Sequence, residues 1–217
     1  VRSRRQRQMC IRDRLQTKQE LLAKLTALTS VPDDNNIYLK EKVKKALLKS
    51  PELLYAFHNL DLEDTELFNP DGTINYDGDW TMYYGEEGNI HPHFYLPNTQ
   101  DKVRHHLCFK TEFTDIPKYN QIMCYMNVTF LVMVDVRDAI DPLTGITRHD
   151  LIGSILRERF NWSNIFGAHC NIVSDKESFT DSNYIIRTIV LEQETTNNIT
   201  GIRNGKRQVI NKQPWTS

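Results

Sequence analysis

Residues 121–160 read QIMCYMNVTFLVMVDVRDAIDPLTGITRHDLIGSILRERF, and this segment specifies the central architecture of the chain. From Ile122 to Val136 every second residue is apolar or sulfur-containing. This alternation predicts a β-strand, and further apolar residues at the intervening positions predict partial cover on both of its faces. At about 3.3 Å per residue the strand would span about 50 Å, so we expect it to bend or to reach past its own domain.

The segment that follows this strand predicts a turn and then a helix. Residues 141–145, DPLTG, end the strand because proline and glycine favour turn geometry. Thr147 and Asp150 have the spacing of a capping-box-like pair at a helix start. The next apolar residues form one helical face that we expect to pack on the sheet: Leu151, Ile152, Ile155, Leu156 and Phe160.

The N-terminal part of the chain predicts three helices, over residues 15–28, 37–49 and 51–59. The third is marked by Ser50 as N-cap and Pro51 at the first helical position. Residues 60–88 are acidic and turn-rich, and are expected to be a solvated loop that Trp80, Tyr83 and Tyr84 anchor on the core. The prolines and aromatic residues of 89–97 predict an extended segment.

The C-terminal half predicts three more strands, over residues 103–113, 169–174 and 184–192. Residues 195–217 are polar and are expected to form a mobile tail or an arm that a partner orders. The expected fold class is α+β: N-terminal helices followed by a β-β-α-β-β unit, with a mostly antiparallel sheet and a helix packed on one face. The order of the strands stays open. The expected divisions of the chain are 1–14 (non-native arm), 15–59 (helices), 60–102 (acidic loop and extended segment), 103–194 (α+β core) and 195–217 (tail).

Charge is distributed unevenly, although the formal net charge of the chain is −1. Residues 1–14 hold six arginines and one aspartate, so the rest of the chain is net negative. Residues 4–14, RRQRQMCIRDR, resemble a translated sequencing-adapter fragment of the kind fused to reading frames in metagenomic assemblies. We interpret 1–14 as non-native and exclude it from the fold, the alternative being a genuine basic arm.

The cysteines and the hydropathy pattern restrict the class of protein further. Cys10, Cys108, Cys124 and Cys170 are scattered without a CxxC pair, so a disulfide framework is not expected and a reducing cytoplasm is the default. No run of 18 apolar residues is present, and the arginine-rich start lacks the apolar core of a secretory signal. We therefore expect no membrane partner.

The candidates for chemistry are few. His106 and Cys108 share a strand face, where His91 or His93 could join them in a metal site or a hydrolase, but zinc spacings and nucleophile motifs are missing. Asp71, Asn75, Asp77 and Asp79 do not match the spacing of an EF-hand. Asp138 and Asp141 are expected to be solvated in the turn, and Arg148 to pair locally with Asp150. We therefore expect no enzyme activity, no metal and no cofactor.

Several of these stretches together resemble a family of tailed-bacteriophage neck proteins, the tail-completion or tail-terminator type of head–tail connector. The resemblance covers residues 37–194. It is carried by SPELL at 50–54, NIHPHFYLPNT at 89–99, the strand around Cys108 and Phe109, the long strand, and residues 141–155. The acidic segment 60–88 and the helix before Ile37 depart from the pattern.

The resemblance implies a non-enzymatic virion protein at the head–tail junction, assembled in the host bacterial cytoplasm. It implies a homo-oligomeric, usually hexameric ring between portal/adaptor and tail-tube proteins, through which DNA passes without specific binding. Residues expected at partner interfaces are Ile90, His91, Phe94, Tyr95, Pro97, Asp141 and Arg148. The alternative function is a small protein-binding module that uses residues 80–95.

Overall fold

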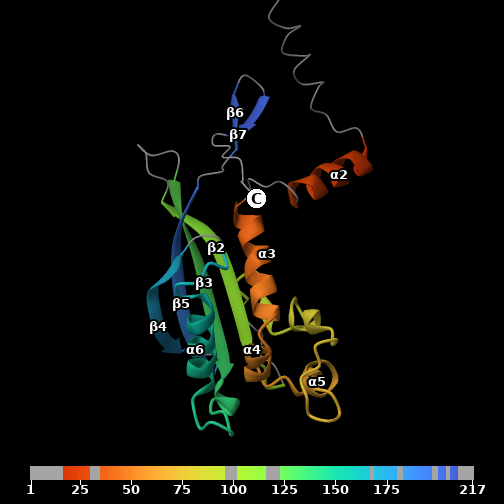
Figure 1. Cartoon of the computed structure of the whole chain (residues 1–217), viewed down its shortest axis with the longest axis vertical. Coiled ribbons are helices and arrows are strands. Elements are labelled where there is room, and N and C mark those ends of the chain that lie inside the picture. The colour runs from red at the N-terminus through yellow and green to blue at the C-terminus, as the bar shows by residue number, and fades with distance from the viewer. Residues whose placement is uncertain are drawn as a thin grey trace, which may run out of the picture.

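A five-stranded sheet lies at the centre of the computed structural model (Figure 1). The structure describes residues 17–29, 35–95, 102–115, 123–166, 169–179, 183–196, 200–203 and 206–209, so the arm 1–14 and Pro97 lie outside it. The strands are β1 (Ile90–His91), β2 (His106–Asp115), β3 (Met123–Asp135), β4 (Cys170–Phe179) and β5 (Tyr184–Thr196). Their order is β1-β2-β3-β5-β4, and only the β1–β2 pair is parallel.

The long central strand β3 follows the period-two pattern of its sequence. The side chains of its predicted core face, from Cys124 to Val134, are buried. Thr129, Met133 and Asp135 are buried on the other face as well, which confirms the predicted cover on both sides. Phe130 stands opposite Phe109 of β2 and Ile189 of β5, so the three strands place apolar residues in one row.

The connection through the helix α6 (Arg148–Phe160) resolves the strand order. The chain leaves β3, passes through α6 and enters β4 at the edge of the sheet, and β5 then returns between β3 and β4. β4 continues to Phe179, beyond the predicted end at residue 174, because its charged second half pairs with β5. Charged residues such as Lys176 and Glu177 are typical of an edge strand and resemble a loop in composition.

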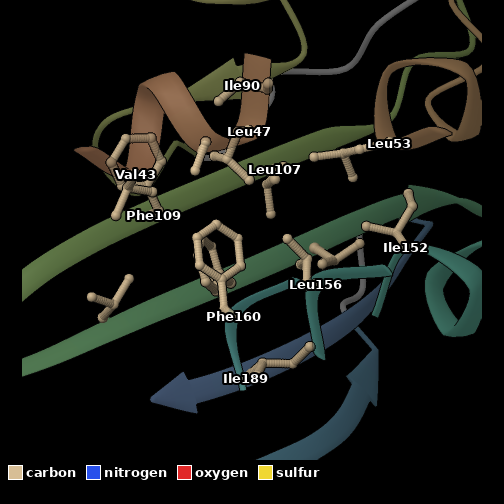
Figure 2. Packing of buried hydrophobic residues seen from close by; sticks show 14 of the residues in the cluster. Val43, Leu47, Leu53, Ile90, Leu107, Phe109, Ile152, Leu156, Phe160 and Ile189 are labelled. Atoms are coloured by element: carbon tan, nitrogen blue, oxygen red, sulfur yellow. The ribbon is translucent and has the colours of Figure 1, made fainter. Parts of the chain in front are cut away.

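The helices α3 (Asn35–Leu48), α4 (Pro51–Ala56) and α6 pack on the same face of the sheet. Figure 2 shows Val43 and Leu47 of α3 lying over β2, with Phe160 and Leu156 of α6 in the same core. The predicted α6 face is confirmed, since Ile152, Leu156 and Phe160 are buried. The structure is therefore α+β with a mostly antiparallel sheet.

Two predicted helix starts are correct in position but different in detail. Ser50 and Thr147 are the N-cap residues of α4 and α6, yet neither side chain caps the backbone. The Ser50 hydroxyl donates to Glu52, and the Thr147 hydroxyl donates to the Asp150 carboxylate. α4 ends at Ala56 instead of residue 59, and His58 takes the left-handed conformation with φ of 47°.

The acidic segment 60–88 is more organised than the predicted solvated loop. It contains the turns α5 (Leu60–Leu62), the π-helical η1 (Glu63–Leu67) and the 3-10 helix η2 (Trp80–Tyr83). Tyr83 is buried, and Trp80 and Tyr84 pack partly on the core, as their predicted anchoring role requires. The Trp80 indole N–H also donates to the Glu66 carbonyl oxygen at 3.1 Å.

The C-terminal tail contains one short hairpin among its described residues. β6 (Thr200–Arg203) and β7 (Lys206–Val209) form an antiparallel hairpin separate from the main sheet. The remaining helix, α2 (Lys18–Thr29), lies apart from the sheet in Figure 1. Across the described residues, no helix has both the length and the apolar character that crossing a membrane requires.

Candidate functional site

Three polar side chains meet around Asp138, at the end of the sheet where β3 passes into α6. Asp138 lies in the 3-10 turn η3 (Val136–Asp138), and its Oδ2 accepts from His58 Nδ1 at 2.7 Å and from His105 Nε2 at 3.0 Å. Its Oδ1 accepts from the Arg148 guanidinium at 3.1 Å. His58 follows α4, His105 precedes β2 and Arg148 opens α6, so four distant parts of the chain build the cluster.

Arg148 is buried as deeply as His105, with 1% of its side chain exposed. It donates to the Asp138 carbonyl oxygen at 3.1 Å and to the Ala56 carbonyl oxygen at 3.2 Å, and lies 3.5 Å from an Asp141 carboxylate oxygen. Asp141 is also buried and accepts from the Thr144 backbone and hydroxyl. The predicted Arg148–Asp150 pair and the predicted solvation of Asp141 are therefore wrong. The Arg148 side chain reaches back into the turn that precedes its helix.

The hydrogen bonds assign the tautomer of His105. Its Nε2 must donate, because the ionised Asp138 carboxylate only accepts, and its Nδ1 accepts from the Asp135 N–H at 3.2 Å. Burial lowers the pKa of His105 despite its bond to Asp138, so the ring is neutral. Burial alone would raise the pKa of Asp138, but hydrogen bonds from His58 and His105 and the charge of Arg148 lower it to about 2.

A cavity of about 420 Å³ opens beside this cluster. His58 is the more accessible of the two histidines in the cluster, and its Nδ1 lies 2.7 Å from the Asp138 carboxylate. A histidine paired with a carboxylate is a common partner for proton transfer in general acid–base chemistry. None of the lining residues is a serine, threonine or cysteine. The lining consists of Phe57, His58, Asn59, Leu60, Asp61, Asn89, Lys102, Val103, Arg104 and Asp138.

The predicted histidine and cysteine candidates lie on the opposite face of the sheet. His91 Nε2 and His106 Nδ1 are 3.0 Å apart, and the Tyr95 ring stacks on His91 at 4.7 Å. Burial lowers the pKa of His91 to about 4 and that of His106 to about 3, and raises that of Cys108 to about 11. At neutral pH these groups are therefore uncharged, and Cys108 is a thiol that donates to the Tyr95 carbonyl oxygen and not a thiolate nucleophile.

The residues expected at partner interfaces occupy two places. Ile90 and His91 are buried in β1, and Asp141 and Arg148 are buried at the start of α6. Phe94 is exposed and Tyr95 half-buried, next to the undescribed Pro97. In this conformation the four buried side chains can act on a partner only by positioning the surface above them.

Three Asp and Asn side chains of segment 60–88 form local turns. Asp71 and Asp79 accept from the backbone N–H groups of Thr73 and Thr81, and Asn75 accepts from that of Asp77. Each bond spans two residues, which is the geometry of an Asx-turn. This local bonding explains why the segment is rich in Asp and Asn without the spacing of a calcium loop.

Comparison with known proteins gives one finding. A search of curated proteins finds no match. The model of the YomW family matches residues 42–193, which include α6 and the five strands up to residue 193. Because this match spans more than half of the 217-residue chain, the protein belongs to the YomW family, a protein family of SPβ-like phage regions of Bacillus.

Proposed function

We propose that this chain is a structural virion protein of a tailed phage, whose copies form a ring at the head–tail junction. The ring completes or terminates the tail and joins it to the portal/adaptor complex, and DNA passes through it without specific binding. The core of the subunit in this proposal is the β-β-α-β-β unit of β2, β3, α6, β4 and β5. The resemblance to neck proteins and the phage origin of the family support this function.

The observation that carries the proposal is an apolar turn between β3 and α6. Four large apolar side chains in this turn are exposed, including Leu143 at 73%. The four are Val136, Ile140, Leu143 and Ile146. Exposed apolar residues are ordinary when scattered singly, but several in one turn are typical of a contact surface.

The buried Arg148 cluster holds this apolar turn in shape. Arg148 binds the Asp138 carbonyl oxygen, Asp141 accepts from Thr144, and Ile140 forms a β-bridge with Thr147. A turn that is already ordered loses little conformational entropy when a partner binds. The buried candidate site thus supports the exposed turn from inside the protein. This gives Asp141 and Arg148 a positioning role at the proposed interface.

A second exposed apolar surface lies on α2, through Leu21, Leu22 and Leu25. Figure 1 shows α2 and the turn between β3 and α6 near opposite ends of the long axis. A closed ring requires each subunit to offer two different surfaces to its neighbours. The turn and α2 supply two such surfaces.

Light scattering on the full chain at several concentrations tests the ring. We expect a discrete hexamer in the wild type and smaller species in Leu143→Asp. The matched control is Tyr76→Asp, at an exposed residue of segment 60–88, which should leave the hexamer intact. A chain that stays monomeric at every concentration, and also with purified portal and tail-tube proteins, contradicts the proposal.

The alternative, a small binding module that uses residues 80–95, rests on the exposure of Met82 and Phe94. The aromatic side chain of Trp80 contacts that of Tyr76, whereas the side chain of Tyr95 stacks on His91. The two aromatic residues therefore belong to separate pairs. A monomer that captures a phage protein, and loses it in Phe94→Asp but not in Leu143→Asp, would favour this module over the ring.

A further inference from the structure

Three potential metal ligands converge where α6 begins and the edge strand β4 runs beside it. His149 and Asp150 lie in the first turn of α6, and Glu177 lies in β4. His149 Nε2 is 3.5 Å from a Glu177 carboxylate oxygen and 3.7 Å from an Asp150 carboxylate oxygen. The ligand atoms of the three residues all lie within 4.8 Å of one another.

These separations are too long for hydrogen bonds but suit ligands that share an ion. Zinc binds imidazole nitrogen and carboxylate oxygen at about 2.0–2.2 Å, so two ligands in a tetrahedral site stand about 3.4 Å apart. The two distances measured from His149 Nε2 are close to this value. The ligand atoms of the three residues lie within 4.8 Å of one another, so the two carboxylates must move toward each other to share one ion.

His149 supplies an independent observation that points to a ligand. Its side chain is 4% exposed, and neither of its ring nitrogens has a hydrogen-bond partner. Buried polar atoms without partners are rare in folded proteins, because each loses the hydrogen bonds that it made to water. Nε2 is directed between two carboxylates, where a bound cation would satisfy it.

The charges around the three residues also leave room for a cation. Arg187 binds Asp175 at 2.8 Å and contacts Asp150, and Arg157 contacts Asp175. The carboxylates of Asp150, Asp175 and Glu177 therefore outnumber the two guanidinium groups of Arg157 and Arg187. Glu177 is 60% exposed and can take an ion from solvent, with water filling the remaining coordination positions.

We infer that His149, Asp150 and Glu177 form a binding site for one first-row divalent cation, with zinc as its probe. The pairing of one imidazole with two carboxylates suits zinc and neighbouring transition metals better than calcium or magnesium. The ion joins the start of α6 to the edge strand β4. This site lies on side chains other than those of the apolar turn and does not rest on the proposed ring.

A proton on His149 is the competitor of the metal, since a protonated imidazole would satisfy the same two carboxylates. Metal ligands must be deprotonated, so protons compete with zinc for this site. His149 Nδ1 has no partner to orient the ring, and we therefore expect micromolar rather than tighter affinity.

Isothermal titration of the untagged full chain with zinc tests the site. We expect one zinc per chain in the wild type and an affinity at least about 100-fold lower in Glu177→Gln and His149→Ala, because each removes a direct ligand. Glu177 lies on the surface, so its variant stays informative if His149→Ala fails to fold. Cobalt should bind the wild type with the visible absorption of a low-coordinate site, and Glu177→Gln should lose that absorption.

Two matched variants show that the loss is specific. Glu158→Gln removes an exposed carboxylate from the same helix, and His93→Ala removes an exposed imidazole elsewhere. Both should bind zinc as the wild type does. No zinc uptake by the wild type, or uptake that survives in Glu177→Gln, would overturn the assignment.

Discussion

Arg148 holds together the end of the sheet where the candidate site lies, because it joins three segments from inside the protein. It binds the carbonyl oxygen of Ala56, the carbonyl and carboxylate oxygens of Asp138, and approaches Asp141. Removing one member of a buried ion pair is costly because the remaining charge stays buried without compensation. The contribution of Arg148 to the turn can therefore be measured as a change in the free energy of unfolding.

We predict that Arg148→Met lowers the free energy of unfolding by about 3 kcal/mol, although methionine keeps much of the volume. Urea denaturation followed by circular dichroism measures this change. Arg159→Met is the control, since Arg159 lies at the other end of α6 with a longer 3.8 Å contact to the partly exposed Glu52. It should lose less than about 1 kcal/mol. Equal losses in the two variants would contradict the central role of Arg148.

The lowered pKa of Asp138 predicts a pH dependence of stability. Its pKa is about 2 in the folded protein against an ordinary value of 3.8, so the folded state favours the ionised carboxylate. The resulting stabilisation is complete above the unfolded pKa and is lost as the pH falls from about 4 to about 2. We expect this loss to be about 2 kcal/mol smaller in Asp138→Asn, measured by urea denaturation between about pH 6 and pH 2.5. A pH dependence equal to that of the wild type would refute the assignment.

At the scale of elements, the segment 60–88 depends on close approaches of its own backbone. A Cβ atom at Gly78 would overlap the Glu66 carbonyl oxygen, which is also the acceptor of the Trp80 indole N–H. Glycine is needed here because two backbone segments come too close for any side chain. The glycine thus couples the π-helical turn η1 to the 3-10 helix η2.

We predict that Gly78→Ala opens this segment while the sheet stays folded. Limited proteolysis should show faster cleavage within residues 60–88, because proteases cut where local structure opens. The neighbouring Asp77→Ala changes an exposed side chain and should leave the cleavage rate unchanged. Unaltered cleavage of Gly78→Ala would mean that the close approach does not hold the segment.

At the scale of the whole molecule, the proposed ring contacts are apolar and not ionic. Raising sodium chloride from about 0.1 M to about 0.5 M screens exposed charges but leaves apolar contacts intact. We therefore expect the hexamer measured by light scattering to persist across this range. Dissociation at high salt would indicate that ion pairs, and not the turn and α2, hold the subunits together.

Local periodicity was enough to predict the main elements of this protein. The alternation in β3 and the apolar face of α6 depend only on residues near one another in the chain, and each repeats the geometry of its own backbone. The α+β class followed from those elements. The second half of β4 was missed because charged residues on an edge strand have the composition of a loop, and no local signal distinguishes the two.

The candidate sites depended instead on tertiary structure. His58, His105, Asp138 and Arg148 come from separate elements, and only the packing of α4, β2 and α6 brings them to one carboxylate. The approach of Glu177 to His149 likewise requires β4 at the sheet edge beside α6. Sequence alone determined the periodic elements, such as β3 and α6, because their pattern repeats the geometry of a local backbone. Strand order and long-range packing decided which polar groups meet, because contacts between distant residues leave no periodic trace in a single chain.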